Sequence, residues 1–174
     1  MPKVMKFITV FCFAATVILS VLFYCFGNGI YLTSAIAFGT TFYHLAIRLF
    51  IGFLYNLKMN NHADYTKKWY QTAPWESKLY KFLKVKKCKG KLPTYNPESF
   101  SLKKHTPKEI AQAMCQSELV HETNIVLSFL PIAAYKTFGA FYVFLITSVC
   151  GAVFDLLFVI VQRYNRARII KLFF

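Results

Sequence analysis

Three ionisable residues in the second half of the chain have the types and the spacing of an acid–base site. Glu118, His121 and Glu122 are three and four positions apart, so on a helix their side chains share one face. An imidazole flanked by carboxylates can act as a general base, with one carboxylate fixing its tautomer. We predict that His121 takes a proton from a sugar or lipid hydroxyl while Glu118 orients its ring. Glu122 is predicted to contact the substrate at the same place.

Two other interpretations of this cluster stay open. The three groups could simply cap the inner end of a helix. The Glu-x-x-His spacing of Glu118 and His121 also occurs in carboxylate-bridged metal proteins. Those proteins use two copies of the motif and this chain carries one, so we expect no metal at this site.

A second group of polar residues directly follows the last apolar run. A membrane helix that meets water needs one Lys as an anchor, and this group has far more hydrogen-bonding capacity than that. Its arginines are suited to phosphates or another anionic group through charge-assisted hydrogen bonds, and its amides to a carbonyl or a sugar. We call this group the polar box, and its predicted substrate-binding residues are Gln162, Arg163, Tyr164, Asn165, Arg166 and Arg168.

Three further polar residues lie inside the apolar runs. His44 and Arg48 are four positions apart, and Arg48 is roughly 14 Å from the end of its run at ~1.5 Å per residue. Asp155 is about 9 Å from the end of the last run by the same rise. Charges inside a membrane usually face the bundle interior and pair. We expect Arg48 to pair with Asp155, or with Glu118 or Glu122, either to fix helix register or to contact the substrate.

The elements that must position these residues are long and apolar. The chain has 174 residues, of which 56% are hydrophobic and 18% aromatic, which is unusual for a soluble domain. A bilayer core about 30 Å thick needs roughly 20 residues of helix. We predict an all-α polytopic membrane protein forming a single membrane domain over residues 1–174. Its four transmembrane helices are predicted at about 6–26, 30–57, 117–135 and 138–161.

Two of these predicted helices have features of their own. The first could be a signal peptide, but its apolar part is too long and no small-residue cleavage site follows Phe26, so we expect it to be retained. The third is marginal in length and contains Pro131, so we expect its first turns to begin outside the lipid.

The distribution of basic residues predicts the orientation. Residues 58–108 carry thirteen lysines, both termini are basic, and the turns between the paired runs carry almost no charge. The positive-inside rule places the termini and this middle segment in the cytoplasm, with the chain in the cytoplasmic membrane. The net charge of +14 then reflects topology and attraction to the anionic headgroups of membrane lipids. We expect no nucleic-acid partner.

The cytoplasmic segment, residues 58–108, is predicted to contain an amphipathic helix in the interface plane. This helix begins near Pro74 and has Trp75 and Phe82 on one side and lysines on the other. A basic stretch over residues 84–93 either holds the protein to anionic lipid or binds substrate phosphates. A capping box formed by Thr106 and Glu109 predicts the start of the helix that leads into the third span.

Three stretches, taken in order, resemble one family of membrane proteins. Residues 86–93 read Lys-Lys-Cys-Lys-Gly-Lys-Leu-Pro, residues 117–121 read Ser-Glu-Leu-Val-His, and residues 162–168 read Gln-Arg-Tyr-Asn-Arg-Ala-Arg. They resemble a lysine-rich stretch ending in Leu-Pro, an Ala-Glu-Leu-x-His motif and the C-terminal signature of the glycosyl-4,4'-diaponeurosporenoate acyltransferase family. The resemblance covers roughly residues 75–172.

The resemblance implies an integral membrane enzyme that esterifies the sugar of a glycosylated carotenoid, or another amphiphilic acceptor, with a fatty acyl chain. It implies that His121 is the base toward the acceptor hydroxyl. The polar box would then hold the phosphates of an acyl donor such as acyl-CoA, and Arg48 would stabilise negative charge that develops on the carbonyl oxygen. No Ser or Cys is well placed as a nucleophile, so direct transfer is favoured.

Two other classes of function remain open on the sequence. A lipid-modifying methyltransferase or reductase on a similar compact bundle would also place Arg, Asn and Tyr at the cytosolic end, although no Gly-rich nucleotide loop is present. A non-enzymatic lipid-binding protein would use the polar box to dock headgroups. Replacing His121 with Ala separates an enzyme from a binding protein.

Overall fold

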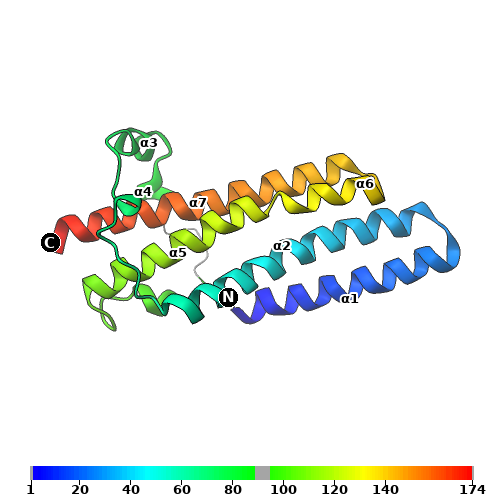
Figure 1. Ribbon diagram of the computed structural model, residues 1–174, viewed down its shortest axis with the longest axis horizontal. Coiled ribbons are helices and arrows are strands. Elements are labelled where there is room, and N and C mark those ends of the chain that lie inside the picture. Colours follow the sequence, from blue (N-terminus) through cyan, green and yellow to red (C-terminus); the bar gives the residue numbers. More distant parts are fainter. Residues whose placement is uncertain (1, 89–94, 174) are drawn as a thin grey trace. The chain divides into compact units, whose positions relative to one another are not determined.

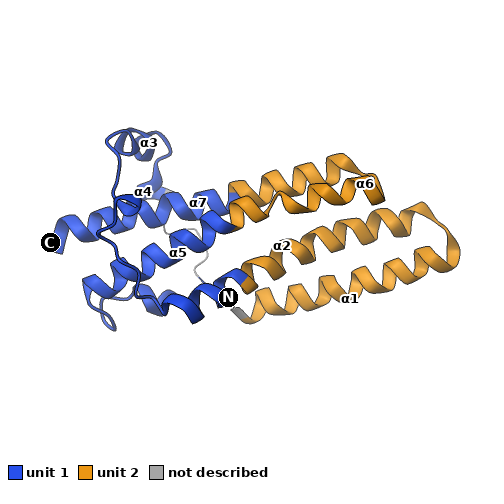
Figure 2. Ribbon diagram, viewed as in Figure 1, with its two compact units in different colours: residues 1, 51–123, 154–174 blue, residues 2–50, 124–153 orange. Residues whose placement is uncertain are grey.

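The helices of the chain fall into two compact units. The computed structural model describes residues 2–88 and 95–173, and within these ranges all regular elements are helices (Figure 1). Among the described residues, unit 1 comprises 51–123 and 154–173, and unit 2 comprises 2–50 and 124–153 (Figure 2).

Unit 2 begins with a hairpin of two long apolar helices, α1 (Pro2–Phe26) and α2 (Gly29–Met59), of which α2 belongs to this unit up to Phe50 (Figure 1). Gly27 turns the chain with a φ of 64°, in the left-handed region that glycine adopts at no steric cost. The side chain of Asn28 then accepts a hydrogen bond from the amide of Ile30, 3.0 Å away, at the start of α2. The predicted turn is therefore the site of a well-formed helix reversal.

Aromatic side chains pack the two helices of this hairpin against each other. The rings of Phe11 and Phe38 meet edge-on with centroids 6.0 Å apart, and those of Phe13 and Phe42 lie 5.1 Å apart. Such pairs contribute about 0.5–1.5 kcal/mol beyond the area that they bury. The phenylalanines that make the chain so aromatic are therefore part of the helix–helix contact as well as of the apolar surface.

The second hairpin of unit 2 links the end of α5 (Pro107–Leu127) to the start of α7 (Phe141–Phe173). The link consists of a 3₁₀ helix, η3 (Leu130–Ala134), and one turn of α-helix, α6 (Tyr135–Phe138). Inside the unit, the hydroxyl of Tyr43 on α2 donates to the carbonyl of Leu127, 2.8 Å away. The two hairpins of unit 2 are thus joined by a hydrogen bond as well as by packing.

The prediction of four membrane spans is wrong in its count. In the described ranges, the helices long and apolar enough to cross a membrane are three, namely α1, α2 and α7. The predicted third span, 117–135, is not among them, for two physical reasons. Its first half lies on α5 beside polar and charged side chains, and Pro131 prevents α5 from continuing, so the helix ends at Leu127 and η3 follows.

Among the described residues, unit 1 contains most of the short helices and the polar middle segment. After α2 come η1 (Lys68–Tyr70), α3 (Glu76–Phe82), α4 (Val85–Cys88) and η2 (Pro97–Phe100), and then α5 and the C-terminal part of α7. A small apolar core forms where Ala63 and Tyr70 pack on Cys115 of α5, with Met59, Tyr65 and Leu119 around them. This core holds the start of the middle segment against α5.

The predicted start of α5 is confirmed. The amide of Thr106 donates to the carboxylate of Glu109, 2.8 Å away, and the amide of Glu109 donates back to the Thr106 hydroxyl, 3.3 Å away. This reciprocal pair is the capping box.

The amphipathic character of the predicted interfacial helix stays a prediction, and the basic stretch over 84–93 lies partly outside the described residues.

The polar box is helical. The predicted last span ends at Val161, but α7 continues without a break to Phe173. The side chains of the box therefore project from a rigid helix at fixed angles, and neighbours three or four positions apart share a face.

Candidate active site

The central contact of the site joins α5 to α7 within unit 1. His121 Nδ1 and Asp155 Oδ1 are 2.8 Å apart, and the Asp155 side chain is fully buried while that of His121 is 20% exposed. An ionised carboxylate at this distance holds the hydrogen on Nδ1 and leaves Nε2 as the basic nitrogen. The sequence assigned the orienting carboxylate to Glu118, whereas in the structure it is Asp155.

An aromatic ring on α7, the helix that carries Asp155, supports the imidazole. The ring of Phe158 stacks on that of His121 with centroids 4.7 Å apart and planes only 10° from parallel. Phe154 in turn meets Phe158 edge-on at 5.0 Å. With Asp155 on one edge and Phe158 on one face, the orientation of the His121 ring is restricted before any substrate binds.

Glu118 lies one helical turn before His121 and is held by two arginines of the polar box. Its carboxylate is fully buried, accepts a hydrogen bond from Arg163 at 2.6 Å and is also bound by Arg166. The Arg166 side chain is 1% exposed, donates to the carbonyl of Tyr70 at 2.7 Å and lies over the Tyr70 ring. The polar box is therefore bound to α5 and to the middle segment through these contacts.

Arg163 connects three separate parts of unit 1. It donates to both oxygens of Glu76 at 2.8 and 3.1 Å, to Glu118, and to the carbonyls of Trp69 and Gln71 at 3.0 and 2.9 Å. A guanidinium has five N–H donors, and this set of bonds uses all of them. The predicted contact of Arg163 with a substrate phosphate would have to replace these bonds and stays a prediction.

Glu76, at the start of α3, is the second carboxylate of this network and is 4% exposed. Burial alone would raise its pKa, but hydrogen bonds from Arg163, from the Tyr80 hydroxyl and from the amide of Ala73 outweigh it and lower the pKa to about 2. The carboxylate is therefore ionised at neutral pH. Together the network contains two carboxylates and two guanidiniums, so its charges balance inside the protein.

Glu122 occupies the third position of the predicted cluster and faces the middle segment. The indole N–H of Trp69 donates to its carboxylate at 3.0 Å. Burial raises the pKa of Glu122, and the hydrogen bond from Trp69 lowers it only in part. Glu118, His121 and Glu122 thus each make a polar contact away from α5, as residues that share one helix face can do.

The remaining residues of the polar box lie on different faces of α7. Gln162 donates to the hydroxyl of Ser117 on α5 at 3.2 Å, on the same side of α7 as Arg166. Tyr164 meets Tyr80 of α3 edge-on at 5.3 Å, and the guanidinium of Arg168 lies 5.8 Å above the Tyr164 ring. Asn165 is partly buried. The structure therefore brings Gln162, Arg163 and Arg166 to α5 at Ser117 and Glu118, and turns Tyr164 and Arg168 toward α3.

The two predicted polar residues of α2 lie in unit 2 and contact α7 there. Arg48 donates to the carbonyls of His44, one turn before it, and of Gly151 at 3.0 Å. A Cβ placed on Gly151 would lie 3.1 Å from His44 Nδ1 and 3.2 Å from the Arg48 guanidinium, so a larger residue would require these side chains to shift by a few tenths of an ångström. The predicted partners of Arg48, which are Asp155, Glu118 and Glu122, all belong to the other unit, and these pairings stay predictions.

Sequence analysis assigned no role in the site to several residues that build it. Glu76 and Tyr80 bind Arg163 and Tyr164 from α3, Trp69 binds Glu122, and Phe158 supports His121. One signal was present for Glu76, because it is one of only seven acidic residues in a strongly basic chain and lies in its lysine-rich segment. Such a residue is expected to have a specific cationic partner.

The polar box, the Glu118–His121 turn and the lysine-rich stretch over residues 86–93 all lie within the region that matches one known family. The sequence profile of the glycosyl-4,4'-diaponeurosporenoate acyltransferases matches residues 66–173, which is more than half of the chain. The chain belongs to this family. The resemblance drawn from three short motifs is thereby confirmed, and the matched region contains His121, Asp155 and the Glu118–arginine network.

Membership of the glycosyl-4,4'-diaponeurosporenoate acyltransferase family, together with three apolar helices of spanning length, identifies a membrane protein of an acyltransferase family. Searches of curated proteins and of solved structures find no match to the chain. The acceptor in the family description is a glycosylated carotenoid acid, and the acceptor and the catalytic residues of this chain are the subject of the proposal below.

Proposed function

We propose that the protein transfers a fatty acyl group from an acyl thioester, such as acyl-CoA, to a hydroxyl of a glycolipid acceptor, with His121 as general base. The observation that carries this proposal is the 2.8 Å contact between His121 Nδ1 and the buried carboxylate of Asp155. That contact favours Nε2 as the basic nitrogen, and the 20% exposure of the side chain supports access of a hydroxyl to the ring.

The reaction needs no covalent enzyme intermediate. His121 Nε2 accepts the proton of the acceptor hydroxyl as its oxygen attacks the carbonyl carbon of the thioester. The new C–O bond forms, the C–S bond breaks, and the imidazolium returns the proton to the leaving thiolate. Asp155 stays ionised throughout and stabilises the imidazolium that forms in between.

The charged network is proposed to position this pair. Glu118 lies one turn before His121 on α5, and Arg163 and Arg166 follow Asp155 on α7 by two to three turns. Fixing Glu118 to these arginines therefore fixes the register of the two helices, which is what brings His121 and Asp155 within hydrogen-bonding distance. Buried ion pairs are best attested in this role of setting register.

The chemistry is proposed to take place at the cytoplasmic face. Within unit 1, the C-terminal part of α7 is bound to the middle segment, since Arg163 and Arg166 donate to the carbonyls of Trp69, Tyr70 and Gln71. These contacts support the proposal that the middle segment and the C-terminal arginines lie on the same side of the membrane. Both are strongly basic, and the positive-inside rule assigns that side to the cytoplasm.

The test is acyl transfer by the purified protein in lipid nanodiscs. Palmitoyl-CoA and glycosyl-4,4'-diaponeurosporenoate serve as donor and acceptor, and the ester is measured by mass spectrometry. His121→Ala is expected to lower kcat by about 10²–10⁴-fold, the usual contribution of a general base. Asp155→Asn is expected to lower kcat with a smaller change in KM, because the ring then loses the group that fixes its tautomer.

A second histidine close to α5 provides a matched control. His105 is a solvent-exposed histidine just before α5, 3.7 Å from Glu109, and His105→Ala should leave the rate near that of the unsubstituted protein. Equal rates for the His121→Ala and His105→Ala proteins would refute the proposed base. Retained lipid binding together with no turnover in the unsubstituted protein would instead favour a non-enzymatic lipid-binding function.

A further inference from the structure

A groove on unit 1 lies on the side of α7 that faces α3. Its volume is about 350 Å³, and Pro74, Ser77 and Tyr80 line it from the middle segment and α3. From α7 it is lined by Tyr164 and Ala167. Its walls are therefore largely apolar and aromatic, with the two tyrosines in edge-on contact at 5.3 Å.

Two basic side chains border this groove. Arg168 and Lys171 line it from α7, and both are exposed. Over the ranges 2–88 and 95–173, no ion pair joins either of them to a carboxylate, whereas the charges of Arg163 and Arg166 are balanced by Glu118 and Glu76. Among the described residues, Arg168 is thus the arginine of the polar box without a carboxylate partner. Together with Lys171 it places two uncompensated positive charges at this groove.

The groove is separate from the proposed reaction centre. Tyr164, Ala167, Arg168 and Lys171 are spaced i, i+3, i+4 and i+7, which places them on one face of α7. At 100° per residue this face is turned away from Asp155, whose side chain contacts His121 of α5. A molecule in the groove would not touch the imidazole.

We propose that this groove binds the phosphate of an anionic glycerophospholipid of the surrounding membrane. A guanidinium and an ammonium together match the charge of one phosphate and donate charge-assisted hydrogen bonds to it. The apolar walls suit the glycerol backbone and the first methylenes of the chains. The tyrosines have the amphipathic character of residues found at the headgroup level of membranes.

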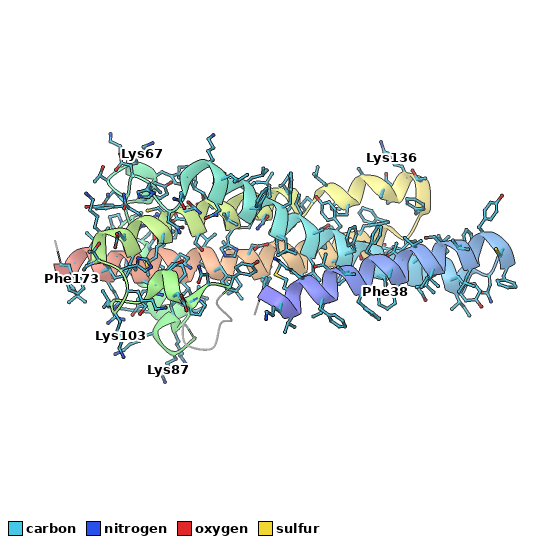
Figure 3. The ribbon with its side chains drawn as sticks, turned by 90° about the horizontal axis from the view of Figure 1, so that it is seen from below. Phe38, Lys67, Lys87, Lys103, Lys136 and Phe173 are labelled. Carbon is cyan, nitrogen blue, oxygen red and sulfur yellow. The ribbon has the colours of Figure 1, made fainter. Side chains whose placement is uncertain are left out.

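The surroundings of the groove favour a lipid over a soluble phosphate. Trp75 and Phe82, at the two ends of α3, are 63% and 82% exposed, which is the exposure expected of side chains that enter a membrane interface. A soluble phosphate would use the two charges but would leave the apolar walls in contact with water. Unlike Arg168 and Lys171, the side chains of Lys67, Lys87 and Lys103 project outward from unit 1 and line no part of this groove (Figure 3).

The experiment is a lipid titration of the full-length protein in detergent, followed by native mass spectrometry. The probes are dioleoylphosphatidylglycerol, which is anionic, and dioleoylphosphatidylcholine, which has no net charge. The first phosphatidylglycerol is expected to bind with a clearly higher affinity than phosphatidylcholine. In the Arg168→Gln/Lys171→Gln protein this affinity should fall roughly 25-fold, at roughly fivefold for each basic residue near the headgroup.

Two further variants separate a built site from general attraction to charge. Lys67→Gln/Lys103→Gln removes the same amount of charge outside the groove and should leave the first binding event unchanged. Ala167→Trp keeps both cations but fills the groove, and should also weaken the first binding event. A shared loss in the Lys67/Lys103 control, or full binding by Ala167→Trp, would overturn the proposal.

The source of the phosphate is tested in the same titration. Inorganic phosphate at 10-fold excess over the lipid is expected not to displace phosphatidylglycerol. Displacement by inorganic phosphate alone would show a site for a soluble anion and would overturn the assignment to a lipid. The proposal does not depend on the acyl transfer reaction, so a protein without turnover can still give either result.

Discussion

The two units satisfy their polar side chains in different ways. In unit 2, polar side chains donate to backbone carbonyls, within their own helix as Thr16 does to Cys12, or on another helix as Tyr43 does to Leu127. In unit 1, charged side chains reach partners that are distant in the sequence, as Arg163 reaches Glu76 across 87 positions. Backbone carbonyls are present whatever the sequence, whereas a buried carboxylate has to be encoded. We infer that unit 1 tolerates substitution of its polar residues far less than unit 2.

The largest expected effect that sharpens this comparison comes from Glu118→Ala in unit 1. The substitution leaves Arg166, which is 1% exposed, buried without a carboxylate and also removes one partner of Arg163. Breaking a buried pair by removing one partner costs about 3–5 kcal/mol. The measurement is the free energy of unfolding by sodium dodecyl sulfate in mixed micelles. Glu98→Ala is the control, because its pair with Lys104 is solvent-exposed, and equal effects of the two would contradict the comparison.

A pH dependence of intermediate size is expected from Glu76. Its pKa is lowered from 4.5 to about 2, so the stability that it contributes is present above pH 4.5 and is lost as the pH falls toward 2. Glu76→Gln removes a charged hydrogen-bond acceptor and should cost about 2 kcal/mol at neutral pH. The difference in thermal midpoint between the two proteins, followed in detergent by circular dichroism, should then shrink as the solution is acidified below pH 4.5. A difference that stays constant from pH 7 to pH 3 would rule out this assignment.

The smallest of the three effects is expected in unit 2, where close approach of helices replaces charge pairing. A Cβ at Gly151 would lie 3.1–3.2 Å from His44 and Arg48, so Gly151→Leu should cost on the order of 1 kcal/mol through overpacking. Gly52 on α2 has open space around it, and Gly52→Leu should instead be neutral or stabilising. The same mixed-micelle titration measures both. Equal destabilisation by the two substitutions would show that the close contact at Gly151 contributes nothing.

Apolar periods and caps were enough to predict most of the helices. The runs of Phe, Leu and Val predicted α1 and α2 closely, and Thr106 and Glu109 predicted the start of α5. The last predicted span ends at Val161, whereas α7 continues twelve residues further to Phe173, since hydropathy reports where an apolar run stops and not where a helix stops. The third predicted span, 117–135, was already marginal in length, and it is not among the candidate spans because α5 carries polar side chains and ends before Pro131.

The partners within the site were harder to predict than its members. Sequence spacing correctly grouped Glu118, His121 and Glu122, because residues three and four apart share a helix face. It could not say that Asp155 rather than Glu118 would reach His121, because that depends on which helices are neighbours and on their register. It also could not separate the arginines of the polar box, of which Arg166 is buried and Arg168 is exposed. Those outcomes depend on how unit 1 packs around α7.

The five hydrogen bonds of Arg163 have a consequence for how the chain matures during synthesis. Two carbonyls of residues 69–76 and the Glu76 carboxylate bind an arginine that is translated 87 positions after Glu76. Until then the buried Glu76 carboxylate has no cationic partner from α7. A nascent chain truncated before Arg163 should therefore be cleaved by protease between α2 and α5, and the full-length chain should resist cleavage there. The C-terminal part of α7 thus completes a region made more than eighty residues earlier.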